Sequence, residues 1–347
     1  MAAIITEKFR LNNAKQFVED MTEGTSKSYM FVGRGHSWTD DSTPPTPVDN
    51  PNDEYDAYRN MIALKAITTS DISHAIVRRD WTSGTTYDEY RHNYSSGNTA
   101  SSTATSLWSS LYYVVTDDYN VYKCLSNGTA DGTAANASTV KPDHTTVATP
   151  TESDQYQWKY MYSISASDVI KFVTNDFLPI KTMGATLAVH GGVSNAAGDN
   201  DGRLGDAATD DGSAQWDVEN GAVDGALDKV RVIAAGSGYT VSTSTALIAI
   251  RGDGASGVAT VVTNGSGGVS SCSITTAGSG YTTAYIANED IPGFDNASQR
   301  ADGTNVSANI EFIIAPKNGH GADPITELGA NYVILNSRLE YAEGSGD

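Results

Sequence analysis

An internal duplication in the second half of the chain constrains the fold more than any other feature of the sequence. Residues 230–240 recur as residues 272–282, and both copies hold the run Gly-Ser-Gly-Tyr-Thr. Each copy continues into a short apolar strand, an Asp-Gly turn at 253–254 or 302–303, and a further β-branched strand. Repeats of strand, glycine turn and strand are typical of a small all-β module. We therefore expect a duplicated β-module in this region.

Tyr239 and Tyr281 follow the two glycine turns of this repeat. The simpler interpretation is a tight turn in which the Tyr ring packs over the glycines, because most aromatic rings serve as core. The alternative is that the two rings bind carbohydrate. The repeat therefore supports either a structural module or a receptor- or glycan-binding module.

The N-terminal region contains two helical patterns. The first has Asn12 or Asn13 as its expected cap, and the second spans residues 53–66. Both place apolar side chains at helical spacing, which predicts amphipathic helices. The face of the first helix consists of Ala14, Phe17, Val18 and Met21.

A short apolar run at 29–32 separates these helices and is followed by glycines and prolines. Four apolar residues in a row predict a buried strand, and Gly33 and Gly35 permit a sharp reversal. Pro44, Pro45 and Pro47 make the next segment extended and poor in backbone donors. We expect residues 43–50, the proline arm, to cross onto a neighbouring chain or to lie over the seam between two copies of the chain.

Aromatic and β-branched runs predict further strands before residue 184. Residues 111–115 and 120–125 flank an Asp-containing turn and predict a hairpin. Residues 156–164 alternate aromatic and polar side chains, which predicts a half-buried strand. A strand is also expected near 73–79, and Asp323-Pro324 predicts a short helix followed by a strand at 332–335.

These elements predict a mainly β, α+β chain of several domains, with antiparallel sheets and a few short helices. We expect a mixed core domain at residues 1–183, and an inserted Gly-rich linker and duplicated β-module at 184–315. Residues 316–347 should return to the core domain. The chain ends without an obvious closing element, so the core domain is expected to continue beyond it.

Composition excludes several classes of function. The formal net charge is −20, which repels phosphate backbones and anionic lipids, so we expect neither nucleic-acid binding nor membrane insertion. The 18 Tyr against 7 Phe favour surfaces where a ring is buried and its hydroxyl meets a partner. Cys124 and Cys272 lie far apart and are expected to be free, buried thiols of a chain made in the cytoplasm.

The sequence offers weak candidates for a metal or phosphate site. His36, Asp40 and Asp41 lack the second His that a zinc protease motif needs, and Gly33-Arg34-Gly35 lacks the rest of a phosphate loop. The acidic runs at 199–202 and 210–212 lack the spacing of a calcium loop. We therefore expect no catalytic residues, metal site or cofactor. A wall-degrading hydrolase stays open as an alternative because paired carboxylates meet in space rather than in sequence.

The run Arg78-Arg79-Asp80-Trp81 is the strongest candidate for a binding site in the sequence. Arg forks bind carboxylates, and Arg and Trp are enriched at interface hot spots. The alternative is an internal salt bridge that fixes the end of a strand. The candidate interface residues are Trp38, Pro44, Pro45, Pro47, Arg78, Arg79 and Trp81.

Several of these motifs occur in the order and at the distances found in a known family. They are residues 5–10, 31–34 with Trp38, the proline arm, 76–81, 121–125 and 156–162. Together they resemble the baseplate wedge protein of T-even-type contractile-tailed phages, the gene eight family, over roughly residues 5–180. The Gly-Ser-Gly-Tyr-Thr module departs from that form and resembles insertions in structural proteins of marine cyanobacterial phages.

The resemblance implies a mainly β structural protein without catalytic activity. It implies a homodimer that joins other baseplate wedge proteins and is located in the virion, after assembly in the host cytoplasm. In such a protein, arms and aromatic-rich faces bind neighbours, while acidic glycine-rich loops keep the unassembled chain in solution.

Overall fold

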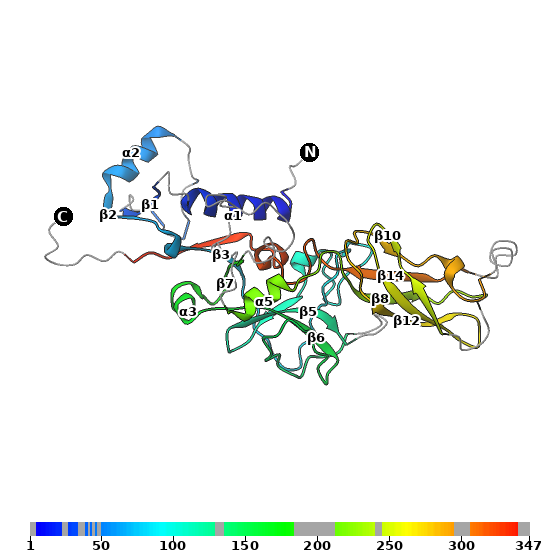
Figure 1. Cartoon of the computed structure of the whole chain (residues 1–347). Helices are drawn as coiled ribbons and strands as arrows, with labels where there is room; N and C mark the ends of the chain where they lie inside the picture. Colours follow the sequence, from blue (N-terminus) through cyan, green and yellow to red (C-terminus); the bar gives the residue numbers. More distant parts are fainter. Residues whose placement is uncertain are drawn as a thin grey trace.

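The computed structural model describes residues 5–22, 27–33, 39–40, 42–43, 46, 50–128, 135–183, 212–239, 245–294 and 306–338. These residues form several small antiparallel sheets with a few short helices, so the predicted mainly β class is confirmed. Figure 1 shows an elongated arrangement in which the duplicated module lies at the opposite end from helix α2.

Two three-stranded antiparallel sheets form the body of the molecule. In the first sheet the central strand lies between neighbours that are distant in sequence, so residues from both ends of the chain meet there, whereas the strands of the second sheet follow one another in chain order. In sheet order, the strands are β15 (Tyr332–Leu335), β3 (Ile72–Val77) and β7 (Phe177–Ile180) in the first, and β4 (Tyr113–Val115), β5 (Asn120–Asn127) and β6 (Tyr156–Ser163) in the second.

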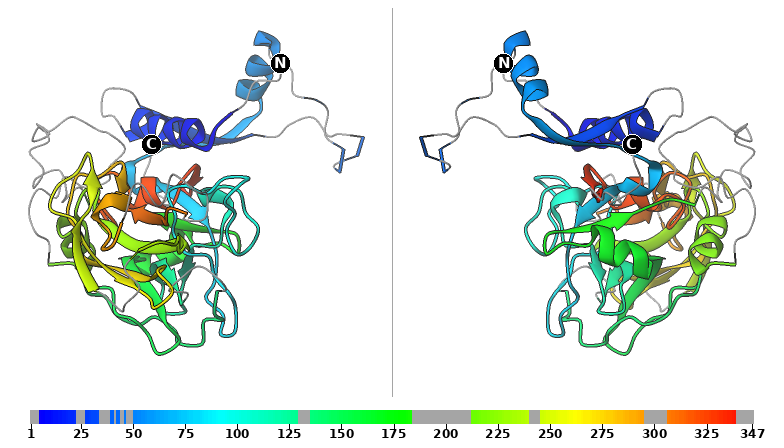
Figure 2. Two further views of the ribbon diagram at one scale, coloured as in Figure 1. Left: turned by 90° about the vertical axis from the view of Figure 1, so that its right-hand side faces the viewer. Right: turned by 90° about the vertical axis from the view of Figure 1, so that its left-hand side faces the viewer.

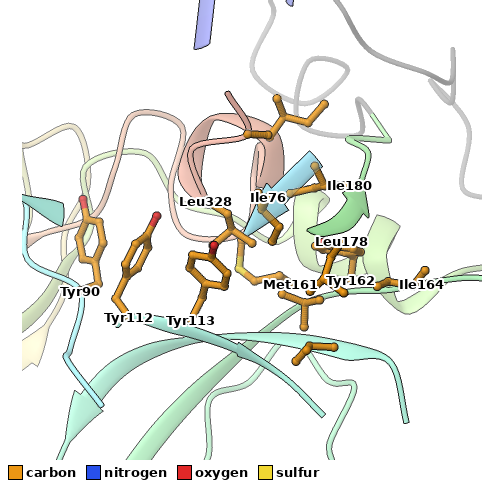
Figure 3. Packing of buried hydrophobic residues seen from close by; sticks show 14 of the residues in the cluster. Ile76, Tyr90, Tyr112, Tyr113, Met161, Tyr162, Ile164, Leu178, Ile180 and Leu328 are labelled. Atoms are coloured by element: carbon orange, nitrogen blue, oxygen red, sulfur yellow. The ribbon is translucent and has the colours of Figure 1, made fainter. Parts of the chain in front are cut away.

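The main hydrophobic core lies between these two sheets (Figure 3). Ile76 and Leu178 from the first sheet pack with Met161 from the second. Two buried tyrosines also connect the sheets by hydrogen bonds. The Tyr113 hydroxyl donates to the carbonyl of Val77 at 2.8 Å, and the Tyr162 hydroxyl donates to that of Pro179 at 3.0 Å. The excess of Tyr thus contributes to the interior of the body.

The β4–β5–β6 sheet also buries its other face. Trp158 stacks on Tyr156 with ring centroids 5.4 Å apart and meets the edge of Tyr87 at 5.5 Å. Helix α5 (Ala214–Asn220), capped by Ser213, covers this aromatic cluster through the buried Val218. Strand β6 is therefore buried on both faces, and the predicted half-buried strand is wrong in this respect. Helix α5 falls in a region that the sequence predicted to be linker.

Helix α1 (Glu7–Thr22) contacts β3 and β15. It begins earlier than predicted, because the Thr6 hydroxyl accepts a hydrogen bond from the Phe9 amide at 3.2 Å. The predicted cap at Asn12 or Asn13 is therefore wrong. The buried residues are Leu11, Ala14 and Val18, whereas Phe17 is 42% exposed.

The second predicted helix ends early. Helix α2 (Pro51–Arg59) is followed by strand β2 (Met61–Ala66), which pairs with β1 (Tyr29–Gly33) in a separate two-stranded sheet. Cross-strand pairing prevails over the helical spacing of residues 61–66. The expectation that residues 29–32 form a buried strand is also wrong, because no side chain of β1 is buried.

The duplicated module is confirmed as a β-structure in which the two copies exchange strands. The first strand of copy one, β8, pairs with the last strand of copy two, β14; likewise β12 pairs with β11. The strands are β8 (Leu227–Ala234), β9 (Thr245–Ala249), β10 (Arg251–Gly252), β11 (Val258–Thr263), β12 (Val269–Thr276), β13 (Ala284–Tyr285) and β14 (Asn309–Ile314).

The glycine turns have the same conformation in both copies. Gly236 and Gly278 both have φ of 64°, a left-handed conformation that favours glycine. Tyr239 and Tyr281 are each 2% exposed, and Tyr281 lies against Gly278, so the prediction of a Tyr packed over the turn is confirmed for the second copy. Rings buried in this way have no face free for a sugar. Residues 302–303 lie outside the described residues.

The remaining helices are short. Helix α3 (Ala166–Phe172) has Ser165 as its cap, and α7 (Pro324–Glu327) begins after Asp323 as predicted. Three 3-10 helices lie at Thr69–Asp71, Leu107–Ser109 and Asn288–Asp290. The module has its own hydrophobic core, whose members include Tyr239, Tyr281 and Phe312. The domain boundaries at residues 183 and 315 stay predictions.

Candidate functional site

The segment Arg78–Trp81 directly follows β3 and contributes the candidate interface residues that the structure describes. The Arg78 Nε donates to both carboxylate oxygens of Asp80, at 2.9 and 3.1 Å, and Nη1 donates to the Thr174 carbonyl at 3.2 Å. The Arg78 side chain remains 27% exposed. Asp80 and the Thr174 carbonyl thus hold its guanidinium in place at the surface.

Arg79 and Trp81 make mainly internal contacts. The Arg79 guanidinium lies 4.5 Å from the ring centroid of Tyr113 and donates to the carbonyls of Ser110 and Trp108. Trp81 Nε1 donates to Ser138 Oγ at 3.0 Å, and its ring packs on the aromatic cluster of the body. Arg79 and Trp81 thus fit the internal role that was the alternative for this run. Arg78 keeps an exposed guanidinium and still fits an interface role.

The other candidate interface residues, Trp38, Pro44, Pro45 and Pro47, lie outside the described residues. Interface roles for all seven stay predictions. Arg78, Arg79 and Trp81 lie together at the end of β3 because they are neighbours in the sequence. The structure therefore shows their internal partners but, among the described residues, brings no further candidate residue next to them.

The structure does not support the weak metal-site candidates of the sequence. His36, Asp41, and the acidic residues 199–202 and 210–211 lie outside the described residues. Asp40 accepts hydrogen bonds from the amide and hydroxyl of Ser42 at 2.9 and 2.6 Å, which lower the pKa of its carboxyl. Among the residues that the structure describes, no group of three His, Cys, Asp or Glu side chains could hold a metal ion.

A buried ionic cluster that no local sequence pattern predicts lies where the module meets the body. Lys123 on β5 is fully buried and pairs with Glu327 on α7. The His320 Nε2 pairs with Asp228 at the start of β8, and its Nδ1 lies 3.9 Å from Glu327. Glu327 also accepts hydrogen bonds from the amides of Gly321 and Asp323.

Burial sets the protonation of this cluster. It lowers the pKa of His320, against the opposing effect of Asp228, and it lowers the pKa of Lys123, against the opposing effect of Glu327. Nearby, burial together with the charge of Lys123 lowers the pKa of Lys159 to about 8. A neutral His320 leaves the two carboxylates beside two buried lysines, Lys123 and Lys159, of which Lys159 is 6% exposed.

These groups hold the structure together and are closed to substrate. His320 is 7% exposed and Glu327 is 5% exposed, so a substrate has no access to either side chain. A second tie joins the same parts, because Lys229 on β8 pairs at 2.6 Å with Glu89, which is fully buried and also pairs with Arg91. Lys123 and Glu327 are 204 positions apart, and no local sequence pattern reports such a contact.

Comparison with known proteins agrees with the resemblance in the first part of the chain. Residues 3–151 match the family described as Bacteriophage T4, Gp8. Gp8 is a structural protein of the phage baseplate, and the segment similar to it makes up less than half of the chain. No curated protein matches the chain.

The Gp8 match includes α1, the β1–β2 sheet, α2, β3 and the β4–β5 hairpin, and it ends before β6. It therefore contains the Arg78–Trp81 segment. The described part of the duplicated module lies wholly outside the matched residues. None of the described helices is long and apolar enough to cross a membrane.

Proposed function

We propose that the chain is a structural subunit of a baseplate wedge in a contractile phage tail. It acts by forming a homodimer and by binding other wedge subunits, and it performs no catalysis. The Gp8 match over residues 3–151 is the observation that carries this proposal. Assembly takes place in the host cytoplasm before the particle is complete.

The test is co-expression with other wedge proteins of the same phage. We expect sedimentation of the purified chain to give a dimer at micromolar concentration, and we expect the chain to copurify with wedge subunits in a fixed ratio. A chain that remains monomeric and that copurifies with no wedge subunit would remove the proposal.

Arg78 is the residue of the predicted interface best placed to bind a neighbouring wedge subunit. Its guanidinium is held at the surface by Asp80 and the Thr174 carbonyl, so little side-chain freedom is lost on binding. Interface arginines that pair with carboxylates cost about 1–3 kcal/mol when truncated. We expect Arg78→Ala to weaken binding to a wedge subunit about tenfold in a titration by calorimetry.

Arg251→Ala is the matched control, because Arg251 is also a surface Arg paired with carboxylates, Glu289 and Asp290, but lies on the module. It should leave the affinity unchanged. Equal losses for the two variants would contradict an interface role for Arg78.

The module makes this chain a cyanophage-type variant of the wedge subunit in our proposal. What supports this is the duplicated Gly-Ser-Gly-Tyr-Thr sequence, which lies outside the segment that matches Gp8. Wedge proteins from the corresponding phages should carry the same insertion between β7 and β15, and its absence from them would refute the variant assignment.

Glycan binding by the particle is a second candidate, favoured by a polar groove of about 740 Å³ between the module and residues 92–98. Arg231, Asn93 and Glu311 line it; Asn93 and Arg231 both donate to the Glu311 carboxylate, Arg231 through Nη1 at 2.9 Å. A glycan array decides between the candidates: binding abolished by Arg231→Gln supports this role, and a silent array removes it.

A further inference from the structure

The β1–β2 sheet and α2 form an arm that projects from the body. The arm comprises Tyr29–Gly33, Pro51–Arg59 and Met61–Ala66, and Figures 1 and 2 show it standing clear of the two body sheets. None of its described side chains is buried. A two-stranded sheet and a nine-residue helix are at best marginally stable in water when they bury nothing. Among the described residues, the arm therefore buries too little surface to account for its stability.

One face of the arm's sheet is apolar throughout. The register pairs Phe31 with Leu64 and Tyr29 with Ala66, and these four side chains share one face. Tyr29 is 52% exposed, Phe31 38% and Leu64 51%. We call these four residues the apolar face.

The opposite face is more covered and carries the arm's polar strand residue. Met30 pairs with Lys65, both are partly buried, and Lys65 Nζ donates to the Arg338 carbonyl at 2.8 Å. Ordinary antiparallel sheets turn their polar side chains to water and their apolar side chains inward. This sheet does the reverse, which is the pattern of a surface that another protein covers.

The charge distribution favours a second copy of the chain as that protein. The whole chain carries a formal charge of −20, so two copies repel each other over most of their surface. Residues 27–33 and 50–66, by contrast, hold equal numbers of acidic and basic side chains. The apolar face itself has no charged residue. Contact through the neutral arms does not require the acidic surfaces of the two bodies to meet.

The area of the arm also fits a dimer. Exposed fractions of its large apolar side chains range from 38% to 71%; these are Tyr29, Phe31, Tyr55, Tyr58, Ile62 and Leu64. At about 150–250 Å² for a large ring, the exposed parts of these six side chains on two arms amount to on the order of 1,200 Å², the lower end of the range for stable interfaces, so Tyr55 and Tyr58 of α2 must contribute along with the apolar face.

We propose that two copies of the chain associate through their arms, with the apolar faces of the two β1–β2 sheets packed against each other. A two-fold axis makes the same patch meet itself, and an uncharged apolar face is complementary to its own copy. This inference rests on the proposed homodimer and specifies its surface. Arg78 and the rest of the body remain free for other wedge subunits.

Leu64→Glu and Leu64→Lys test the proposal together. Each variant places like charges on both copies at the centre of the apolar face, so each alone should raise the dimer dissociation constant at least 100-fold in sedimentation equilibrium. An equimolar mixture of the two should recover a dimer, because opposite charges then face each other. Recovery on mixing cannot come from variants that have failed to fold.

The matched control is Leu247→Glu, which places the same charge on β9 of the module, where Leu247 is 69% exposed. It should dimerise like the wild type. If either Leu64 variant alone dimerises with wild-type affinity, or if the mixture stays monomeric, the arm is not the dimer surface, and the homodimer itself is untouched. A wild-type chain that is monomeric at about 50 μM removes both proposals.

Discussion

Single residues in this chain are constrained most tightly at the glycine turns of the module. A Cβ built on Gly254, in the Asp-Gly turn, would lie 2.6 Å from the Ser279 carbonyl oxygen and 2.4 Å from Cγ of Tyr281. The Tyr281 hydroxyl is fixed there, since it donates to Ile250 and accepts from the Gly257 amide. Side chains larger than that of glycine are therefore sterically excluded at position 254.

We predict that Gly254→Ala lowers the unfolding free energy by about 1–3 kcal/mol, the usual cost of overpacking. Gly265→Ala is the matched control, because a Cβ there meets no atom within 4 Å. It should change stability by less than about 0.5 kcal/mol. Urea titrations followed by circular dichroism measure both, and equal effects would contradict the steric explanation.

His320 gives the junction cluster a dependence on pH. Burial lowers its pKa below the ordinary value, so the unfolded chain binds more protons than the folded chain in the window below about pH 6.5. The contribution of His320 to stability is therefore complete above that pH and is lost as the pH falls. Asp228, Glu327, Lys123 and Tyr90 surround the ring.

We predict that His320→Gln removes part of this acid sensitivity, because Gln is neutral throughout and can still donate to Asp228. The unfolding free energies of the wild type and the variant, measured between pH 7.5 and 5.5 (roughly one unit either side of the ordinary His value), should converge as the pH falls. Parallel curves would show that His320 does not titrate in this way.

At the scale of elements, the helices and strands that were predicted correctly are those with local sequence signals. The β4–β5 hairpin, the repeat and the start of α7 follow from turn residues and alternation within a few positions. The prediction of a helix over residues 53–66 was wrong for residues 61–66, because their apolar spacing fits a helix and a strand about equally. Pairing with β1, more than 30 positions away, determines the outcome.

Helix α7 depends on Asp323, which accepts from the Thr326 amide at 3.2 Å and from the Thr182 hydroxyl at 2.8 Å. We predict that Asp323→Ala costs about 1–2 kcal/mol, as loss of an N-cap does. Asp323→Asn keeps an acceptor oxygen at the cap and should retain most of that stability in the same urea titration. Equal losses would show that the charge near Lys15, rather than the cap, is what matters.

At the scale of the whole molecule, the body and the module have separate hydrophobic cores joined by buried ion pairs. The junction depends on contacts between residues distant in sequence, so the sequence predicts the two parts but not the ion pairs that connect them. The match to Gp8 concerns the body and the arm alone.

Glu89→Gln should weaken this junction, because Lys229 and Arg91 then lose the charge of a fully buried partner. All five Trp residues lie at or before position 216, so Trp fluorescence reports the body and circular dichroism reports both parts. We predict coincident thermal transitions in the wild type and, in Glu89→Gln, a circular-dichroism transition that begins at lower temperature. Transitions that still coincide in the variant would contradict this role of Glu89.

The exchange of strands between the two copies of the module also sets an order on biosynthesis. Strand β8 leaves the ribosome long before β14, the strand with which it pairs, and β3 waits still longer for β15. Neither sheet can close until the last part of the described chain has been made. A ribosome that stops early therefore releases a protein with open strand edges, which proteases and chaperones recognise before it can enter a particle.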